Sequence, residues 1–339
     1  MITPGGINSS SPLTSKTNLK AVSDSLKLIM TTLTSSHFEI KPSAQTLGAQ
    51  ILGLDLSKAL SLDCIEALMR ALGTHGVLSF PKQTLSAREL ATFSARFGEL
   101  EINVANNYQE PGIPEVMILS NMLDNGKPLG IADAGQDWHT DMSYSKMIAF
   151  ANVLYGIKIP FRDGVSLGNT VFCNMHQAYE ELPEPLKEKI NGATATHDFS
   201  KFWDKMRMEK GSSRPPLSPA QKLAKPPVSH PLTMLHPITK RRVLYANPGY
   251  AMSIDGMQAQ ESQEILDRLF EHQLQKHLQY KHHWQEGDVL MWDNFGTIHN
   301  AVADYLPHEH RFIKRCQVMA TRFFNDDGSP KAFPPAWAA

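Results

Sequence analysis

The chain of 339 residues lacks several features that would assign it to a well-defined class. Its three cysteines, Cys64, Cys173 and Cys316, are odd in number and widely spaced, which excludes a disulfide framework and any cysteine-based metal motif. This usage is typical of a reducing compartment, so we expect a cytoplasmic protein. No apolar run approaches the ~18 residues of a membrane span, so we expect no membrane partner.

A strong charge of one sign is also missing. Lys and Arg number 33 and Asp and Glu number 34, so the chain carries no basic field that would attract nucleic acid. Apolar residues make up 42% of the chain, which is enough for a sizeable core. A small molecule is therefore the expected partner, and a homo-oligomer, dimer or tetramer, stays open.

Residues 1–36 differ in composition from the rest of the chain. They are rich in Ser and Thr, contain a single acidic residue, Asp24, and lack both an arginine and a signal-length apolar run. We expect a flexible leader at 1–36 and one folded domain at 37–339. Residues 201–227 are polar, basic and rich in proline, and they predict a lid-like insertion within that domain.

Short apolar runs separated by turn residues dominate the body of the chain. The patterns predict strands at 38–40, 49–54, 77–80, 171–173, 243–246, 289–292 and 312–319. They predict helices at 61–73, 86–97, 177–190 with an interruption near Pro183 and Pro185, and 260–274. Many short strands without a βαβ rhythm favour an antiparallel sandwich or barrel with helices packed outside, a mainly β fold with α.

The stretch QDWHTDMSY places His139 and Asp141 two positions apart. On an extended strand such residues share a face and reach one point in space. A third ligand has to come from elsewhere, and His299, after the strand-like VLMW and a short turn, is the best candidate. Two histidines and one carboxylate form the open-sided facial triad of non-haem Fe(II) oxygenases. A bare H-x-D is weak in a chain with 14 histidines, so a second signal is needed.

Two arginines provide that signal. Arg311 and Arg315 lie in HRFIKRCQV and would share one strand face with Ile313 and Gln317. An inward-facing arginine is costly unless it meets an anion, and a dicarboxylate co-substrate would supply one in a bidentate pair.

Four ordered motifs now resemble a known family. The chain reads WHTD, then LGNTxFCNMxxAYExLP, then MWDNxxxxH, then RxxxR. This set, within a match from about residue 40 to 323, resembles the taurine dioxygenase family of Fe(II)/2-oxoglutarate-dependent dioxygenases, which includes the 2,4-dichlorophenoxyacetate and phenoxypropionate dioxygenases. The resemblance implies a double-stranded β-helix, a cupin-like jelly roll with outer helices.

Site residues follow from the resemblance position by position. His139, Asp141 and His299 match the iron ligands, and Arg311 and Thr170 match the residues that bind the distal carboxylate of 2-oxoglutarate. The family usually reads Gly-Gly-Asp-Thr around this threonine, whereas this chain has Asn169 in place of the aspartate. The implied reaction consumes 2-oxoglutarate and O2, releases succinate and CO2, and hydroxylates a substrate. A hydroxylated carbon that bears oxygen, nitrogen or sulfonate would then undergo C–X cleavage.

Substrate residues depart from the taurine pattern. Asn103 and Asn106 stand where taurine dioxygenases carry a histidine and a tyrosine. We therefore expect a small organic acid other than taurine, with Asn103 and Asn106 donating hydrogen bonds and Arg315 binding the anionic group. No further basic residue is predicted beside this pocket.

Two other classes stay open at this point. One is a redox-silent jelly-roll metalloenzyme that uses Zn(II) in the same triad. The other is a non-catalytic protein that binds 2-oxoglutarate. The pairing of Arg311 with Thr170 argues against the first class, and the intact triad argues against the second.

Overall fold

The computed structural model describes Met1 and residues 38–102, 108–210, 212 and 215–331. Within these ranges one large sheet of eight strands forms the main layer, in the order β1-β2-β3-β18-β8-β20-β5-β4. Its strands are antiparallel except for the parallel pair β2 and β3. The bounds are β1 Glu39–Pro42, β2 Ala49–Leu52, β3 Val77–Phe80, β4 Gln109–Glu110, β5 Ile113–Ser120, β8 Ala149–Lys158, β18 Val289–Asp293 and β20 Phe312–Met319.

Smaller sheets accompany the large one. A three-stranded antiparallel sheet runs β17-β11-β19, and a second runs β13-β12-β16. Their bounds are β11 Thr170–Asn174, β17 Gln279–His282, β19 Thr297–Ala301, β12 Thr194–His197, β13 Val228–Pro231 and β16 Ala251–Ile254. Two-stranded ribbons are formed by β6 Leu123–Asp124 with β7 Lys127–Pro128, β9 Phe161–Arg162 with β10 Val165–Ser166, and β14 Thr233–Leu235 with β15 Arg242–Leu244.

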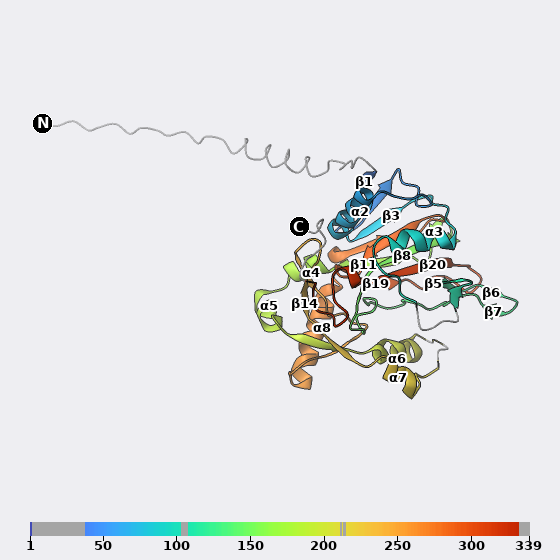
Figure 1. Cartoon of the computed structure of the whole chain (residues 1–339). Coiled ribbons are helices and arrows are strands. Elements are labelled where there is room, and N and C mark those ends of the chain that lie inside the picture. Colours follow the sequence, from blue (N-terminus) through green and yellow to red (C-terminus); the bar gives the residue numbers. More distant parts are fainter. Residues whose placement is uncertain (2–37, 103–107, 211, 213–214, 332–339) are drawn as a thin grey trace.

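Helices cover the outside of these sheets. They are α2 Leu62–His75, α3 Ala87–Ala95, α4 Met175–Glu180, α5 Glu184–Ile190, α6 Phe199–Glu209, α7 Pro219–Ala224 and α8 Ala259–Gln273, with 3-10 turns at Lys276–Leu278 and Ala320–Arg322. Figure 1 shows α2 and α3 beside the large sheet and α5 to α8 on the opposite side of the molecule. Among the helices of the described residues, none combines the length and apolarity that a membrane crossing needs.

Alternation along the strands separates two cores. One face of the large sheet packs against α2 and α3 through residues such as Leu68, Leu90 and Cys316. The other face packs Ile313, Leu290 and Leu154 against Phe172 of β11, so the inner core lies between the large sheet and the β17-β11-β19 sheet. The space between these two sheets is where the candidate site lies.

Several sequence predictions agree with these elements. The predicted antiparallel sheets with outer helices are confirmed, and the helix expected at 177–190 is indeed broken into α4 and α5 at Pro183. The cysteines Cys64, Cys173 and Cys316, for which the sequence predicted no disulfide framework, are free and buried. The division into a leader at 1–36 and a domain at 37–339 stays a prediction, because residues 2–37 lie outside the described ranges.

Residues 201–227, predicted as a lid-like insertion, are partly helical, and their role as a lid stays a prediction. They hold most of α6 and all of α7. Phe202 and Met206 of α6 are buried against Tyr250. Their spacing along the helix places both on one face, so a helical apolar stripe anchors the segment despite its polar composition.

Candidate active site

His139 and His299 face each other across a backbone bridge. His139 N donates to His299 O at 3.0 Å, and His299 N donates to His139 O at 2.9 Å. His299 belongs to β19, so this bridge places the His139 segment beside the edge of the β17-β11-β19 sheet. The two imidazole rings consequently lie with their centroids 4.2 Å apart, although 160 positions separate them in the chain.

Asp141 joins the two histidines. Its Oδ1 lies 3.5 Å from His139 Nε2, and its Oδ2 lies 3.8 Å from His299 Nε2. All three residues are buried, and their ligand atoms lie within 4.8 Å of one another. Asp141 Oδ2 is buried without a hydrogen bond. A buried anionic oxygen is costly without a cation beside it, a role that a metal ion would share with Arg315, whose Nη1 lies 3.6 Å from this oxygen.

The protonation state of the group suits a metal. His139 Nδ1–H donates to the carbonyl oxygen of Asp137 at 2.7 Å, which turns Nε2 toward Asp141. Burial lowers the pKa of His299 to about 3, so its imidazole is neutral at physiological pH. Burial would raise the pKa of Asp141, but His139 and Arg315 hold it well below its ordinary value. Two imidazoles and one carboxylate that converge from one side are the donor set of the non-haem Fe(II) facial triad.

Arg311 lies just before β20 with its side chain enclosed. It is 6% exposed, and its Nε has no hydrogen-bond partner. Burial lowers the pKa of its guanidinium, and contact with Tyr305 opposes that effect. Within the described part of the chain no carboxylate forms a salt bridge with Arg311, so the cation is poised for an anion from outside the protein.

Thr170 faces the same side of its sheet as His299. It pairs with Ala301, two residues beyond His299 on β19, so both side chains leave the same face. The Thr170 hydroxyl accepts a hydrogen bond from Trp284 Nε1 at 3.1 Å, which leaves its own hydrogen available to donate.

The substitution of Asn169 for the expected aspartate is explained by its hydrogen bonds. Asn169 Oδ1 accepts from Ser166 Oγ at 3.0 Å and from Trp284 N at 3.1 Å. Asn169 Nδ2 donates to Ser166 O at 2.7 Å, which a carboxylate cannot do. The loop before Thr170 is therefore held by an amide.

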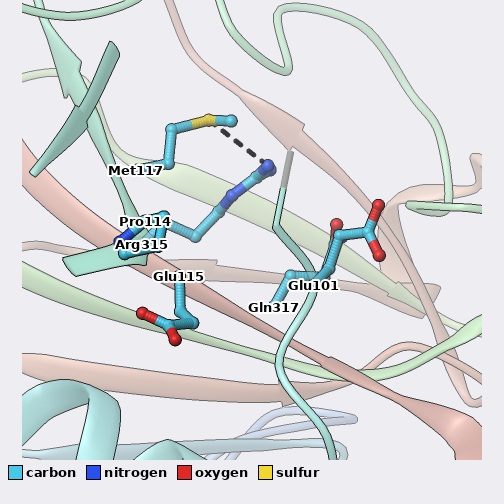
Figure 2. A pocket seen from close by; sticks show the side chains of 6 residues that line it. All are labelled: Glu101, Pro114, Glu115, Met117, Arg315 and Gln317. Atoms are coloured by element: carbon cyan, nitrogen blue, oxygen red, sulfur yellow. Dashed lines mark hydrogen bonds between the residues drawn. The ribbon is translucent and has the colours of Figure 1, made fainter. Parts of the chain in front are cut away.

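Arg315 points from β20 toward the triad. Its Nη1 lies 3.6 Å from Asp141 Oδ2, and its Nη2 lies 3.5 Å from Met117 Sδ. Figure 2 shows the guanidinium extended beside Met117, with Glu101 and Gln317 lining the same small pocket. Arg315 thus shares the inner face with Ile313 and Gln317, as the alternation of the strand predicted.

The opposite wall comes from residues that the sequence did not single out. The Phe202 ring of α6 lies 5.0 Å from the His139 ring, and the Tyr250 ring lies 6.1 Å from it. Tyr144 packs against Tyr250 at 4.7 Å, and Lys225 Nζ lies over the Tyr144 ring at 5.7 Å from its centroid. The sequence predicted no further basic residue beside the pocket; Lys225, which directly follows α7, lies close to this aromatic cluster. Lys225 lies in a polar, proline-rich stretch, and the sequence around it gave no indication of this contact.

Asn103 and Asn106, the two predicted substrate residues, lie outside the described residues. Their roles stay predictions. All the other predicted site residues lie within the described ranges, on β11, β19, β20 or the segments directly before them and on the His139 segment.

Comparison with known proteins decides the family. The model of the taurine catabolism dioxygenase TauD, TfdA family matches residues 39–317. The chain belongs to the TauD/TfdA family.

Relatives found by comparison cover most of the chain. Pentalenolactone F synthase of Streptomyces avermitilis is 30% identical over 296 residues, which is 84% of this chain and 93% of that protein. The alpha-ketoglutarate-dependent 2,4-dichlorophenoxyacetate dioxygenase of Burkholderia sp. is 32% identical over 284 residues, which is 80% of this chain and 91% of that protein. The solved structure of AAD-2 with Mn(II) and N-oxalylglycine superposes with a TM-score of 0.70 at 27% identity, covering 83% of this chain and 98% of that one.

Membership of the TauD/TfdA family settles the reaction class. The chain is a 2-oxoglutarate-dependent dioxygenase whose cofactor is Fe(II) and whose co-substrates are 2-oxoglutarate and O2. The likeness to solved family members also confirms the predicted jelly-roll core with outer helices.

Proposed function

We propose that this dioxygenase hydroxylates a small organic acid and that Arg315 binds the acid's anionic group beside the metal. The observation that carries the proposal is the 3.6 Å between Arg315 Nη1 and Asp141 Oδ2. A cation at that distance from the metal group would draw a substrate anion to the reacting centre. A bound metal cation would already balance the charge of Asp141, so Asp141 by itself does not explain why Arg315 lies there.

The metal would be held by His139, Asp141 and His299. When bound there, Fe(II) supplies the activation of O2 that the protein's own side chains lack. The protein's part is to keep the His299 imidazole neutral and to leave the other side of the site open. The hydrogen bond from His139 to Asp137 O fixes one ring in the orientation that coordination needs.

2-Oxoglutarate would be held by Arg311 and Thr170. Arg311 would form a bidentate pair with the distal carboxylate, and the Thr170 hydroxyl would donate to it. The support is a buried guanidinium whose Nε has no hydrogen-bond partner, together with a hydroxyl on the same side as His299. Tyr305 contacts the guanidinium and Trp284 donates to the Thr170 hydroxyl, and these contacts leave Arg311 Nε and the Thr170 proton available to a carboxylate.

The substrate would combine an anionic group with an apolar body. Arg315 and Lys225 supply two cations, and Phe202, Tyr250 and Tyr144 supply aromatic faces beside His139. The names of relatives agree with this chemistry, because they include dioxygenases of 2,4-dichlorophenoxyacetate and of sulfate esters. Asn103 and Asn106 would add hydrogen bonds, as predicted from the sequence. A hydroxylated carbon next to oxygen would then release its leaving group.

A substrate panel tests the proposal. Sulfonates, including taurine, phenoxy acids, sulfate esters and simple carboxylates would each be supplied with Fe(II), 2-oxoglutarate and O2, and substrate-dependent succinate formation measured. We expect turnover of an organic acid with an apolar body and little turnover of taurine. Taurine as the best substrate, or turnover confined to uncharged compounds, would contradict the proposal.

Two variants localise the anion. Arg315→Gln and Lys225→Met should each raise the KM for the best acid by roughly tenfold, since a charged hydrogen bond contributes on the order of 1.5–3 kcal/mol. The KM for 2-oxoglutarate should stay unchanged. Lys222→Met is the matched control, because Lys222 is an exposed lysine of the same helix, α7. If neither variant changes the KM for the acid, neither Arg315 nor Lys225 binds the substrate anion.

A further inference from the structure

Helix α6 contacts the segment that carries the first metal-site histidine. Phe202 of α6 is buried with its ring 5.0 Å from the ring of His139. Three residues further along the helix, Lys205 forms a close ion pair with Asp137. Apolar packing and a charge pair therefore join α6 to the same short stretch of chain.

Asp137 links that ion pair to His139. Its backbone oxygen accepts the His139 Nδ1–H at 2.7 Å, and its Oδ1 accepts the backbone N–H of Trp138 at 2.9 Å. Its Oδ2 is the atom that pairs with Lys205. The orientation of the His139 ring thus depends on where the backbone of Asp137 is held, and Lys205 holds its side chain.

The pair is sheltered from solvent. The side chain of Asp137 is 13% exposed and that of Lys205 is 31% exposed. Screening by water weakens exposed ion pairs, so a largely covered pair keeps more of its interaction energy. Lys205 is half-buried and lies between the buried Phe202 and Met206 in the sequence of α6, so the ion pair adds to the apolar packing of the same helix.

We propose that the Lys205–Asp137 pair is a latch that couples the docking of α6 to the orientation of His139. The proposal rests on the proposed metal site at His139, Asp141 and His299. Metal binding favours one orientation of His139, and that orientation favours the docked helix. Because coupling between two equilibria is reciprocal, releasing α6 weakens metal binding and removing the metal loosens α6. Lys205 is a positioning residue, since it acts through Asp137.

A double-mutant cycle tests the latch. Mn(II) binding would be followed by the loss of the free-ion electron paramagnetic resonance signal in wild type, Lys205→Met, Asp137→Asn and the double variant. Asparagine keeps the backbone oxygen and the acceptor for Trp138 N–H, so Asp137→Asn removes the charge and replaces the oxygen that faces Lys205 with an amide donor. We expect each single variant to weaken Mn(II) binding about three- to tenfold, below the 10–100-fold typical of a direct partner of a metal ligand. The double variant should be no weaker than either single one.

Two further variants separate a latch from general stabilisation. Lys205→Arg keeps the charge and should restore most of the affinity. Lys222 is an exposed lysine of α7, and Lys222→Met should bind Mn(II) as wild type does.

Limited proteolysis with chymotrypsin would report on the docking of α6, which contains Phe199, Phe202 and Trp203. Mn(II) with 2-oxoglutarate should slow cleavage there in wild type and have a smaller effect in Lys205→Met.

The outcomes distinguish the latch from the metal site itself. If wild type binds Mn(II) and Lys205→Met binds it with the same midpoint, the latch is overturned and the metal site stands. If the two single variants lower affinity additively, the residues act separately and the latch is likewise overturned. A wild-type chain that binds no Mn(II) would overturn both proposals.

Discussion

Gly168 and Arg311 touch because Gly168 has no side chain. A Cβ at Gly168 would lie 2.8 Å from Arg311 Cδ and 2.9 Å from Arg311 Nε, and the φ of Gly168 is +64°. The glycine of the LGNT motif therefore makes room for the guanidinium that we assign to 2-oxoglutarate. The threonine two residues later lies on the same short run of chain, so one loop serves both proposed carboxylate contacts.

Gly168→Ala tests this contact. We expect the KM for 2-oxoglutarate to rise several-fold, because the new methyl group displaces Arg311. Gly164→Ala is the control: its φ of +78° imposes the same backbone strain, but no atom lies within 4 Å of its Cβ position. Both variants should lose stability on the order of 1 kcal/mol, and only Gly168→Ala should change the KM. If the two variants have the same KM for 2-oxoglutarate, Gly168 does not influence the binding of the co-substrate.

Arg311→Gln should weaken 2-oxoglutarate binding strongly while leaving metal binding intact. Losing one partner of a buried charge pair costs on the order of 2–5 kcal/mol, so we expect a roughly thirtyfold or larger rise in KM. Arg241→Gln serves as control, because Arg241 forms an exposed pair with Glu180. An Arg311→Gln enzyme with an ordinary KM for 2-oxoglutarate would mean that a different cation binds the co-substrate.

Asn169→Asp should destabilise the protein although it restores the aspartate of the family motif that this chain resembles. The carboxylate cannot donate to Ser166 O, and it places a charge at a residue that is 1% exposed. We expect a loss on the order of 2–3 kcal/mol, seen as a drop of several degrees in Tm. Asn191→Asp, at the exposed end of α5, should change stability by less than about 0.5 kcal/mol. Matching melting curves for the two variants would show that the amide has no special role.

Local patterns predicted much of the fold. The bounds expected for 77–80 and 312–319 agree with β3 and β20, because an apolar run between a glycine or polar turn and a change of pattern marks a strand. The capping box at Ser86 and Glu89 is present at the start of α3. Alternation on β20 predicted that Ile313, Arg315 and Gln317 share the inner face, and the structure agrees.

Tertiary pairing was beyond the reach of local patterns. Spacing shows that His139 and Asp141 share a face, but the backbone bridge to His299 depends on how distant strands pair. Lys205 and Lys225 look like solvated charges in a polar segment, and their partners Asp137 and Tyr144 become evident only when α6 and α7 are docked. Helix α6 was missed because its charged residues and the prolines beyond it outweighed the spacing of its apolar ones.

The most direct test of the account is the anaerobic addition of Fe(II) and 2-oxoglutarate to the purified chain. Coordination of 2-oxoglutarate to Fe(II) at His139, Asp141 and His299 predicts a weak visible metal-to-ligand charge-transfer band. The band should be lost in His139→Ala, Asp141→Ala and His299→Ala, and it should form in Arg311→Gln only at higher 2-oxoglutarate concentrations. No band in the wild-type chain, or a full band in any of the three alanine variants, would contradict the assignment of this site.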